Sequence, residues 1–157
     1  MSARTASHDY SEHAEAIFWM ASDGISLGWE GAHGAEYRPR QKVSRDAMAA
    51  FLYRWAGSPE FTAPAVSPFT DVSVDNQFFT EIAWLESQGY STGWTEADGS
   101  ATFRPLEPIA RDAMAAFLHR IAGAPEVDVP ATPSFVDVAP GDAFATEIEW
   151  LAGTGIA

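Results

Sequence analysis

A helical pattern of apolar residues occurs twice along the chain, carried by the same residues. Over residues 45–57 the large apolar side chains recur at i, i+3, i+4 and i+7, the spacing of one helix face. The four residues on this face are Met48, Phe51, Leu52 and Trp55. The eight residues that begin at Arg45 return unchanged from Arg111, 66 positions later (111 − 45). We therefore predict two copies of one helix, each ended by a glycine, Gly57 or Gly123, at its C′ position.

The start of this helix carries an unusual charge. Ser44 can cap the first copy, whereas Ala110 cannot cap the second, which we expect to cost on the order of 1 kcal/mol. Arg45 and Arg111 occupy the first turn, where a positive charge opposes the helix macrodipole. Either an anionic ligand or a carboxylate of the same chain is expected to compensate each arginine. The candidate carboxylates are Asp71, Asp137, Glu81 and Glu147.

A second apolar block occurs three times, at residues 16–20, 79–85 and 144–151. Each copy carries a tryptophan and is followed by a glycine turn, which indicates a second type of helix. These three tryptophans, which we expect to pack in the interior, are Trp19, Trp84 and Trp150. The loops between the two helix types contain Tyr37-Arg38-Pro39 and Phe103-Arg104-Pro105. Proline disfavours helix for the residue before it, so both triplets are predicted to be extended.

The two helix types form units of about 65 residues, at 8–68, 69–134 and, in part, 135–157. Such units cannot bury their apolar faces alone and must pack on one another. The pattern therefore predicts a mainly α, pseudo-threefold domain of about two and a half units. Its centre would be a bundle of the three Trp-bearing helices, placing Ile17, Ile82 and Ile148 together, with short extended segments in the loops.

The third unit stops after its first helix, which predicts an uncovered apolar face at Ile148 and Leu151. Residues 1–15 are the local segment able to cover it, and Tyr10 is their single large apolar side chain. An exposed apolar patch marks an interaction surface. We therefore expect a homodimer, with twofold symmetry as the commonest arrangement.

Composition excludes several classes of protein. The net charge of −13 argues against a nucleic-acid partner, because phosphates require a basic surface. The absence of cysteine excludes disulfides and thiolate metal sites. No apolar run approaches the roughly 20 residues of a membrane-spanning helix, so membrane insertion is not expected. The N-terminus lacks the apolar centre of a signal peptide. Either the protein is cytosolic or it is a fragment of a larger protein, and the phase of the repeats favours a fragment.

Catalytic and metal chemistry find little support. The aspartates of 71–76 and 137–142 lack the calcium-loop rhythm and are more typical of turns. A metal site among His8, Glu12 and His13 has no recognised spacing; these residues are assigned to a solvated terminus. Glu81 and Glu86 could form a carboxylate pair of the glycosidase kind, but Glu81 recurs as Glu147, as structural positions do. We predict no enzyme activity, no catalytic residue, no metal and no cofactor.

The order of these motifs is similar to that of the S-layer homology family. Phe69-Thr70-Asp71-Val72, a Trp-bearing helix, a glycine turn, a glycine loop, Phe-x-Pro and an Arg-led helix follow one another, and the resemblance covers nearly the whole chain from Glu12. The resemblance implies a pseudo-threefold helical domain in a secreted or surface protein. It also implies non-covalent anchoring to cell-wall polysaccharide, and hence an extracellular location.

The family's Thr-Arg-Ala-Glu segment corresponds to 44–47 and 110–113. The arginine matches in both copies and the hydroxyl only as Ser44; alanine replaces the glutamate, with an aspartate one place earlier. The resemblance places glycan in grooves between units near this segment. The candidate residues are Ser44, Arg45, Asp46, Arg111 and Asp112, with the loop tryptophans Trp29 and Trp94. The loop indoles could stack on sugar rings or cover the helical core. The alternative function is structural self-association, in which incomplete units are completed between chains.

Overall fold

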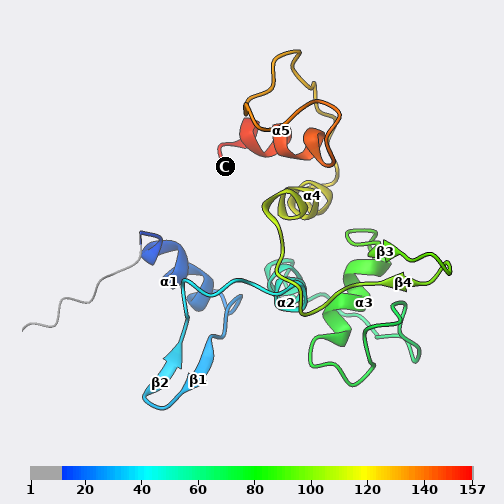
Figure 1. The fold of residues 1–157 in the computed structure, drawn as a ribbon. Coiled ribbons are helices and arrows are strands. Elements are labelled where there is room, and N and C mark those ends of the chain that lie inside the picture. The colour runs from blue at the N-terminus through cyan, green and yellow to red at the C-terminus, as the bar shows by residue number, and fades with distance from the viewer. Residues whose placement is uncertain (1–11, 157) are drawn as a thin grey trace, which may run out of the picture.

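In the computed structural model, which describes residues 12–156, five helices alternate with two short hairpins (Figure 1). The helices are α1 (Ala14–Ser22), α2 (Arg45–Trp55), α3 (Phe79–Ser87), α4 (Arg111–Ile121) and α5 (Ala145–Thr154). The strands are β1 (Trp29–Gly31), β2 (Gly34–Glu36), β3 (Trp94–Thr95) and β4 (Ala101–Thr102). Both hairpins are antiparallel, with β1 paired to β2 and β3 to β4. Within residues 12–156, no helix is both long and apolar enough to cross a membrane.

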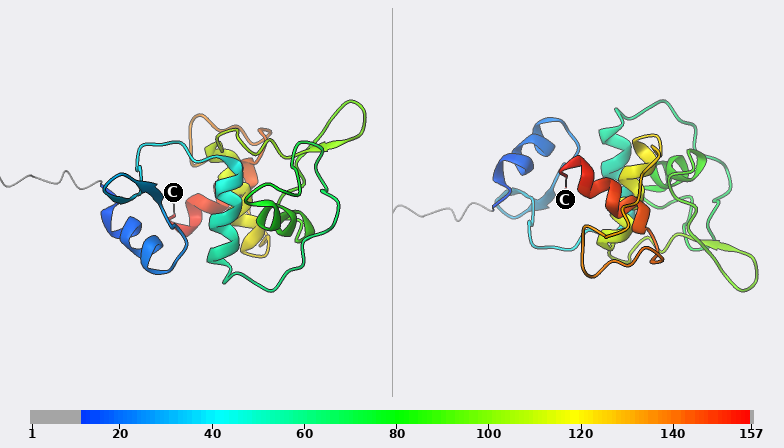
Figure 2. Two further views of the ribbon diagram at one scale, coloured as in Figure 1. Left: turned by 90° about the horizontal axis from the view of Figure 1, so that it is seen from below. Right: turned by 90° about the horizontal axis from the view of Figure 1, so that it is seen from above.

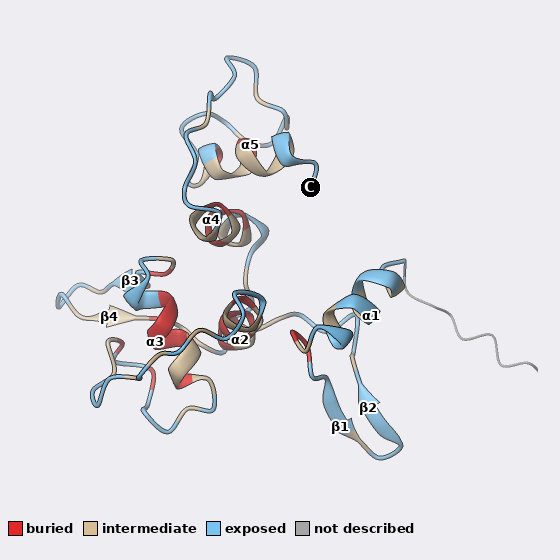
Figure 3. Ribbon diagram, turned by 180° about the vertical axis from the view of Figure 1, so that it is seen from behind, coloured by how far each residue is buried: buried red, intermediate tan, exposed pale blue. Residues whose placement is uncertain are grey.

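Helices pack in pairs that join one unit to the next. α2 packs against α3 and α4 packs against α5, whereas α1 packs against no other helix of the described chain. The main core lies between α2 and α3 and includes Met48, Leu52, Ile82 and Phe103. Figure 3 shows this burial concentrated on α2, α3 and α4, with α1 and the first hairpin largely exposed. The two views of Figure 2 show the α1 segment set to one side of α2.

The predicted mainly α fold with a central three-helix bundle is wrong. Helices make up about 34% and strands about 8% of the structure, which is a small mixed α/β domain. Ile82 is 1% exposed in the core, but Ile17 and Ile148 are only half-buried and lie outside the core cluster. The reason is that α2 presents its apolar stripe to α3 of the next unit, so the Trp-bearing helices do not meet.

The α1 helix lies outside these helix pairs, and large apolar side chains on it are exposed. Phe18 is 64% exposed and Trp19 is 49% exposed, whereas the equivalent Trp84 is 5% exposed. The expectation that Trp19 packs in the interior is therefore wrong. On the duplicated helix, Met48 and Phe117 are buried as expected from the stripe, while Phe51 and Met114 are half-buried against the core.

Each duplicated helix is fastened to its neighbours by the same polar contacts. Arg54 Nη1 donates to the carbonyl of Ile25 at 3.2 Å, and Arg120 Nη1 donates to that of Tyr90 at 3.0 Å. The Tyr53 hydroxyl donates to the Pro59 carbonyl at 2.6 Å. Its counterpart His119 places Nε2 2.9 Å from the Pro125 carbonyl, and because a carbonyl only accepts, Nε2 must carry the hydrogen. The repeated sequence therefore makes equivalent hydrogen bonds in both copies of the helix.

Candidate functional site

The N-terminus of α2 is held by the loop that follows β4. The Arg45 N–H donates to Glu107 O at 2.9 Å and the Asp46 N–H donates to Pro105 O at 3.0 Å. In return the Ile109 N–H donates to Val43 O at 3.1 Å. We call this contact between residues 43–46 and 103–109 the joint. It satisfies helix N–H groups that would otherwise lack partners.

The joint replaces the cap that the sequence predicted. The Ser44 side chain makes no cap hydrogen bond to the helix, so that expectation is wrong. Instead the Ser44 hydroxyl donates to Asp46 Oδ1, which also accepts the Ala47 N–H at 2.7 Å. Asp46 is 4% exposed. Ser44 and Asp46 therefore form a polar pair that supports the helix start from within the joint.

Arg45 lies in an aromatic box at the joint. Its Nε–H donates to Phe103 O at 2.8 Å, and the residue is 7% exposed. The guanidinium carbon is 4.3 Å from the Trp94 ring centroid, 5.0 Å from that of Phe103 and 5.6 Å from that of Phe117. Burial lowers the pKa of Arg45, with Arg104 acting in the same direction and the carboxylates of Glu107 and Asp71 opposing it. Arginine nevertheless keeps its charge in proteins.

A second guanidinium shares the same indole. The Arg104 guanidinium carbon lies 4.4 Å from the Trp94 centroid, and its Nη2 lies 3.4 Å from Glu96 Oε1 on the partly exposed side of the loop. The ion pairs of the described residues are this one and Arg38–Glu36, so Arg45 has no carboxylate partner there. None of the candidate carboxylates forms an ion pair with Arg45, although Asp71, one of them, acts on its charge from a greater distance. Two cations therefore flank one indole, and of the nearby carboxylates only Glu96 forms an ion pair with either of them among the described residues; Glu107 and Asp71 act on Arg45 from a greater distance. Guanidinium groups beside an exposed indole could receive an anion.

The backbone of the site is held in an uncommon conformation. Arg104 has a φ of +58°, so the prediction of an extended Phe103-Arg104-Pro105 segment is wrong. Such a conformation costs on the order of 1–3 kcal/mol for a residue with a side chain. Asp71 holds it in place, because its two carboxylate oxygens accept the N–H groups of Phe103 and Arg104 at 2.8 and 2.7 Å. This contact gives the aspartate of the Phe-x-Asp-Val motif a role in supporting the backbone.

Gly93 places Trp94 beside the arginines. Gly93 has a φ of +65°, and an added Cβ would collide with the carbonyl of Thr102 and come within 2.6 Å of the Phe69 ring. Only glycine fits this close approach. Trp94 is 36% exposed, so its indole reaches solvent while contacting both guanidinium groups.

The second copy of the arginine motif is not enclosed. Arg111 and Asp112 are exposed, and the contact made by the Asp112 carboxylate is with the N–H of Ala113, at 2.6 Å. No carbonyl of the described residues accepts the N–H of Arg111 or Asp112. Although the two helices are identical over eight residues, only the first carries a joint.

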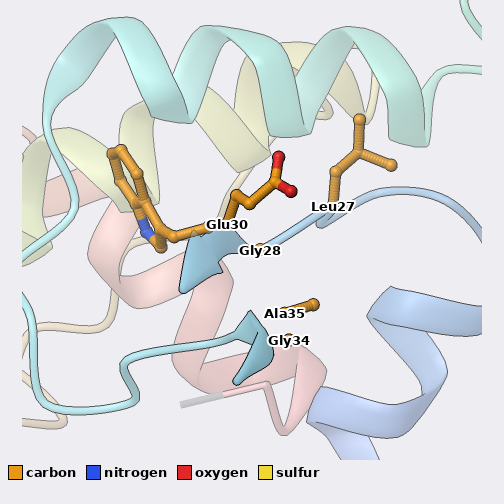
Figure 4. A pocket seen from close by; sticks show the side chains of 6 residues that line it. Leu27, Gly28, Glu30, Gly34 and Ala35 are labelled. Atoms are coloured by element: carbon orange, nitrogen blue, oxygen red, sulfur yellow. The ribbon is translucent and has the colours of Figure 1, made fainter. Parts of the chain in front are cut away.

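Trp29, the counterpart of Trp94, stands apart from both arginine motifs. It is 48% exposed, with the Arg38 guanidinium carbon 5.1 Å from its ring centroid. Figure 4 shows the hairpin around it, where Leu27, Gly28, Glu30, Gly34 and Ala35 help to line a hollow of about 340 Å³. The structure thus brings Ser44, Arg45, Asp46 and Trp94 together and leaves Trp29, Arg111 and Asp112 outside this site.

Sequence reasoning missed the partners that enclose Arg45. Phe117 comes from α4, and Phe103 and Arg104 come from a triplet that was assigned only a backbone role. The signal was present, since the triplet recurs with its arginine as Tyr37-Arg38-Pro39.

No group of three or more histidine, aspartate or glutamate residues could hold a metal ion in the part of the chain from 12 to 156; His8 lies outside that part. Asp142 and Asn76 accept N–H groups of their own turns, from Ala139 and Phe78, both at 2.8 Å.

No protein-family model matches the chain, and no curated protein matches it.

Proposed function

We propose that this chain is a non-catalytic binding module that attaches a surface or secreted protein to an acidic cell-wall polysaccharide. The ligand would lie at the joint, on Trp94 and Arg104, with Arg45 behind them. The observation that carries the proposal is the pair of guanidinium groups within 4.4 Å of one partly exposed indole centroid, with no ion pair to Arg45 among the described residues.

The chemistry of the site fits a charged sugar. The C–H face of a sugar ring packs on an indole, and the indole N–H remains available as a donor. A carboxylate or phosphate on that sugar would accept charge-assisted hydrogen bonds from Arg104, whose planar fork suits such groups. The Arg45 guanidinium, buried in the aromatic box, lies against the same indole, and the carboxylates of Glu107 and Asp71 offset part of its charge.

The remainder of the chain restricts where an anion can bind. With a net charge of −13 the protein repels polyanions over most of its surface, so binding must rest on short-range contacts at the cation cluster. The same charge argues against nucleic acid as the polyanion. The motif order shared with S-layer homology repeats favours a wall polymer as the ligand, and the proposal accordingly places the protein outside the cell.

The test compares the joint with its exposed counterpart. Trp94→Ala and Arg104→Ala are measured beside Trp29→Ala and Arg38→Ala, which alter the same motif positions one unit earlier. We expect the first two variants to bind purified acidic wall polysaccharide at least about tenfold more weakly, since a charge-assisted hydrogen bond contributes about 1.5–3 kcal/mol. At a concentration at which the chain is monomeric, the matched controls should bind as the unaltered chain does.

A second arm identifies the ligand group. When the carboxyl groups of the polysaccharide are reduced to alcohols, Arg104→Ala and the unaltered chain should bind it with equal affinity. Equal binding of intact polysaccharide by all four variants, each shown by circular dichroism to be folded, would overturn the proposal. Arg45 is a less useful target, because its bond to Phe103 O also supports the fold.

A further inference from the structure

The chain contains one assembled joint and, separately, the two halves of another. In the assembled joint, the N–H groups of Arg45 and Asp46 meet the carbonyls of Glu107 and Pro105, and the Arg45 side chain meets the carbonyl of Phe103. At the repeat offset of 66, the donors recur as Arg111 and Asp112. At the same offset the acceptors recur as Tyr37, Pro39 and Gln41.

Among residues 12–156, neither the donors of one half nor the acceptors of the other have a backbone hydrogen-bond partner. No described carbonyl accepts the N–H groups of Arg111 and Asp112, and no described N–H donates to the carbonyls of Tyr37, Pro39 and Gln41. Arg111 is exposed, whereas Arg45 is 7% exposed.

The acceptor half already has the shape that it would need. Arg38 has a φ of +56°, beside +58° for Arg104. The Gln41 N–H donates to Arg38 O at 2.9 Å, as the Glu107 N–H donates to Arg104 O at 3.1 Å. Arg38 also faces the Trp29 indole, as Arg104 faces that of Trp94. Little rearrangement would therefore be required for this loop to receive an Arg-led helix.

We propose that the Trp29 loop of one copy docks on the N-terminus of α4 in a second copy, so that a second Arg–Trp site forms from two chains. In that contact Arg111 of one copy enters the aromatic surroundings of Trp29 and Tyr37 of the other. Glu36, which pairs with Arg38 as Glu96 pairs with Arg104, adds a carboxylate to the loop that approaches this arginine. The inference rests on the geometry of the assembled joint and does not depend on what that joint binds.

The docking uses the loop and not α1. In the assembled joint, the unit that supplies the loop also supplies α3, which packs along α2. The corresponding face of α4 is already covered by α5 of the same chain. α1 packs against no other described helix, so helix packing does not fix where it lies. The two surfaces that meet are different, so the contact is head to tail and generates rings or open chains. This replaces twofold pairing as the expected geometry of association.

Cysteine cross-linking tests the register of the contact. Ser44 and Pro108 form an antiparallel bridge in the assembled joint, and their counterparts are Ala110 and Lys42. The chain has no cysteine, so Lys42→Cys and Ala110→Cys each introduce a unique thiol. After oxidation at micromolar concentration, a mixture of the two variants should form a disulfide-linked pair at least about tenfold faster than either variant alone.

The intrachain control is Ser44→Cys combined with Pro108→Cys, which should oxidise without change of mass and shows that the bridge geometry permits a disulfide. No excess cross-linking in the mixture would overturn the proposal. So would Ala110→Cys pairing mainly with itself, which indicates twofold pairing. Concentration-independent closure of the Lys42→Cys, Ala110→Cys double variant would overturn it as well, because the loop would then dock within its own chain.

A second measurement separates this inference from the proposed function. Trp29→Ala should weaken association in sedimentation by at least about tenfold while leaving polysaccharide binding at Trp94 unchanged. Trp94→Ala should do the reverse. If Trp29→Ala leaves association unchanged, the docking proposal fails while the wall-binding proposal stands.

Discussion

Isoleucine truncation at two equivalent positions tests the helix pairing. Ile82 in α3 is 1% exposed against α2, whereas its counterpart Ile17 lies half-buried on α1, which packs on no other helix. Ile82→Ala removes three buried carbons worth about 0.8 kcal/mol each, or about 2.4 kcal/mol in transfer free energy. With the cavity that remains, the total cost to the free energy of unfolding should be about 2–5 kcal/mol. Ile17→Ala should cost less than about 1 kcal/mol.

Urea denaturation followed by far-ultraviolet circular dichroism measures both losses. With a denaturant slope of about 1–3 kcal/mol per molar, Ile82→Ala should lower the urea midpoint by about 1–3 M. Ile17→Ala should move it by a few tenths of a molar at most, with an unchanged slope. Equal losses at the two positions would refute the reasoning, because they would mean that α1 is packed as α3 is and that the Trp-bearing helices share one core.

Three further sets of substitutions test single contacts of the fold. Gly93→Ala should lower the free energy of unfolding in urea by about 1–3 kcal/mol more than Gly89→Ala, since both have φ near +70° but only a Cβ at Gly93 meets other atoms. Arg45→Lys should lower the free energy of unfolding by about 1–3 kcal/mol in thermal unfolding, because it loses the hydrogen bond to Phe103 O and the flat stack on Trp94. Arg111→Lys should change the free energy of unfolding by less than about 0.5 kcal/mol. Tyr53→Phe should cost about 1 kcal/mol by leaving the Pro59 carbonyl without its donor, and a loss near zero in the same assay would show that water replaces the hydroxyl.

The local elements were predictable because local residues determine them. The apolar stripe located α2 and α4, and the positive φ of Gly57 and Gly123 confirms the glycine ends of both helices. The Ile/Trp blocks located α1, α3 and α5. Periodicity specifies which face of a helix is apolar, but it does not specify which other helix covers that face. The predicted three-helix bundle therefore assumed packing partners that the sequence pattern does not specify.

The candidate site was predictable in part for the same reason. Arg45 and Trp94 stood out because a first-turn arginine and a loop indole each lack an obvious local purpose. Their contact, 49 positions apart in sequence (94 − 45), depends on the Phe103 carbonyl and the Arg104 backbone, both placed by hydrogen bonds to distant residues. A positive φ at an arginine before a proline contradicts the ordinary preference of that position. The carboxylate of Asp71, 33 residues earlier, stabilises this conformation at Arg104, although Arg38 has a φ of +56° with no such bond among the described residues.

The two copies of the duplicated helix separate what a motif supplies from what its surroundings supply. Arg45 and Arg111 begin identical eight-residue segments, yet one is boxed by three aromatic rings and the other is exposed. Identical helices have the same local propensity and the same macrodipole, so the difference in their environment must come from the loop that follows the next helix. The enclosure of Arg45 therefore comes from the joint and not from the arginine motif. Under the proposed function, an Arg-led helix would bind ligand only where a Trp-bearing loop, from the same chain or from another, closes over it.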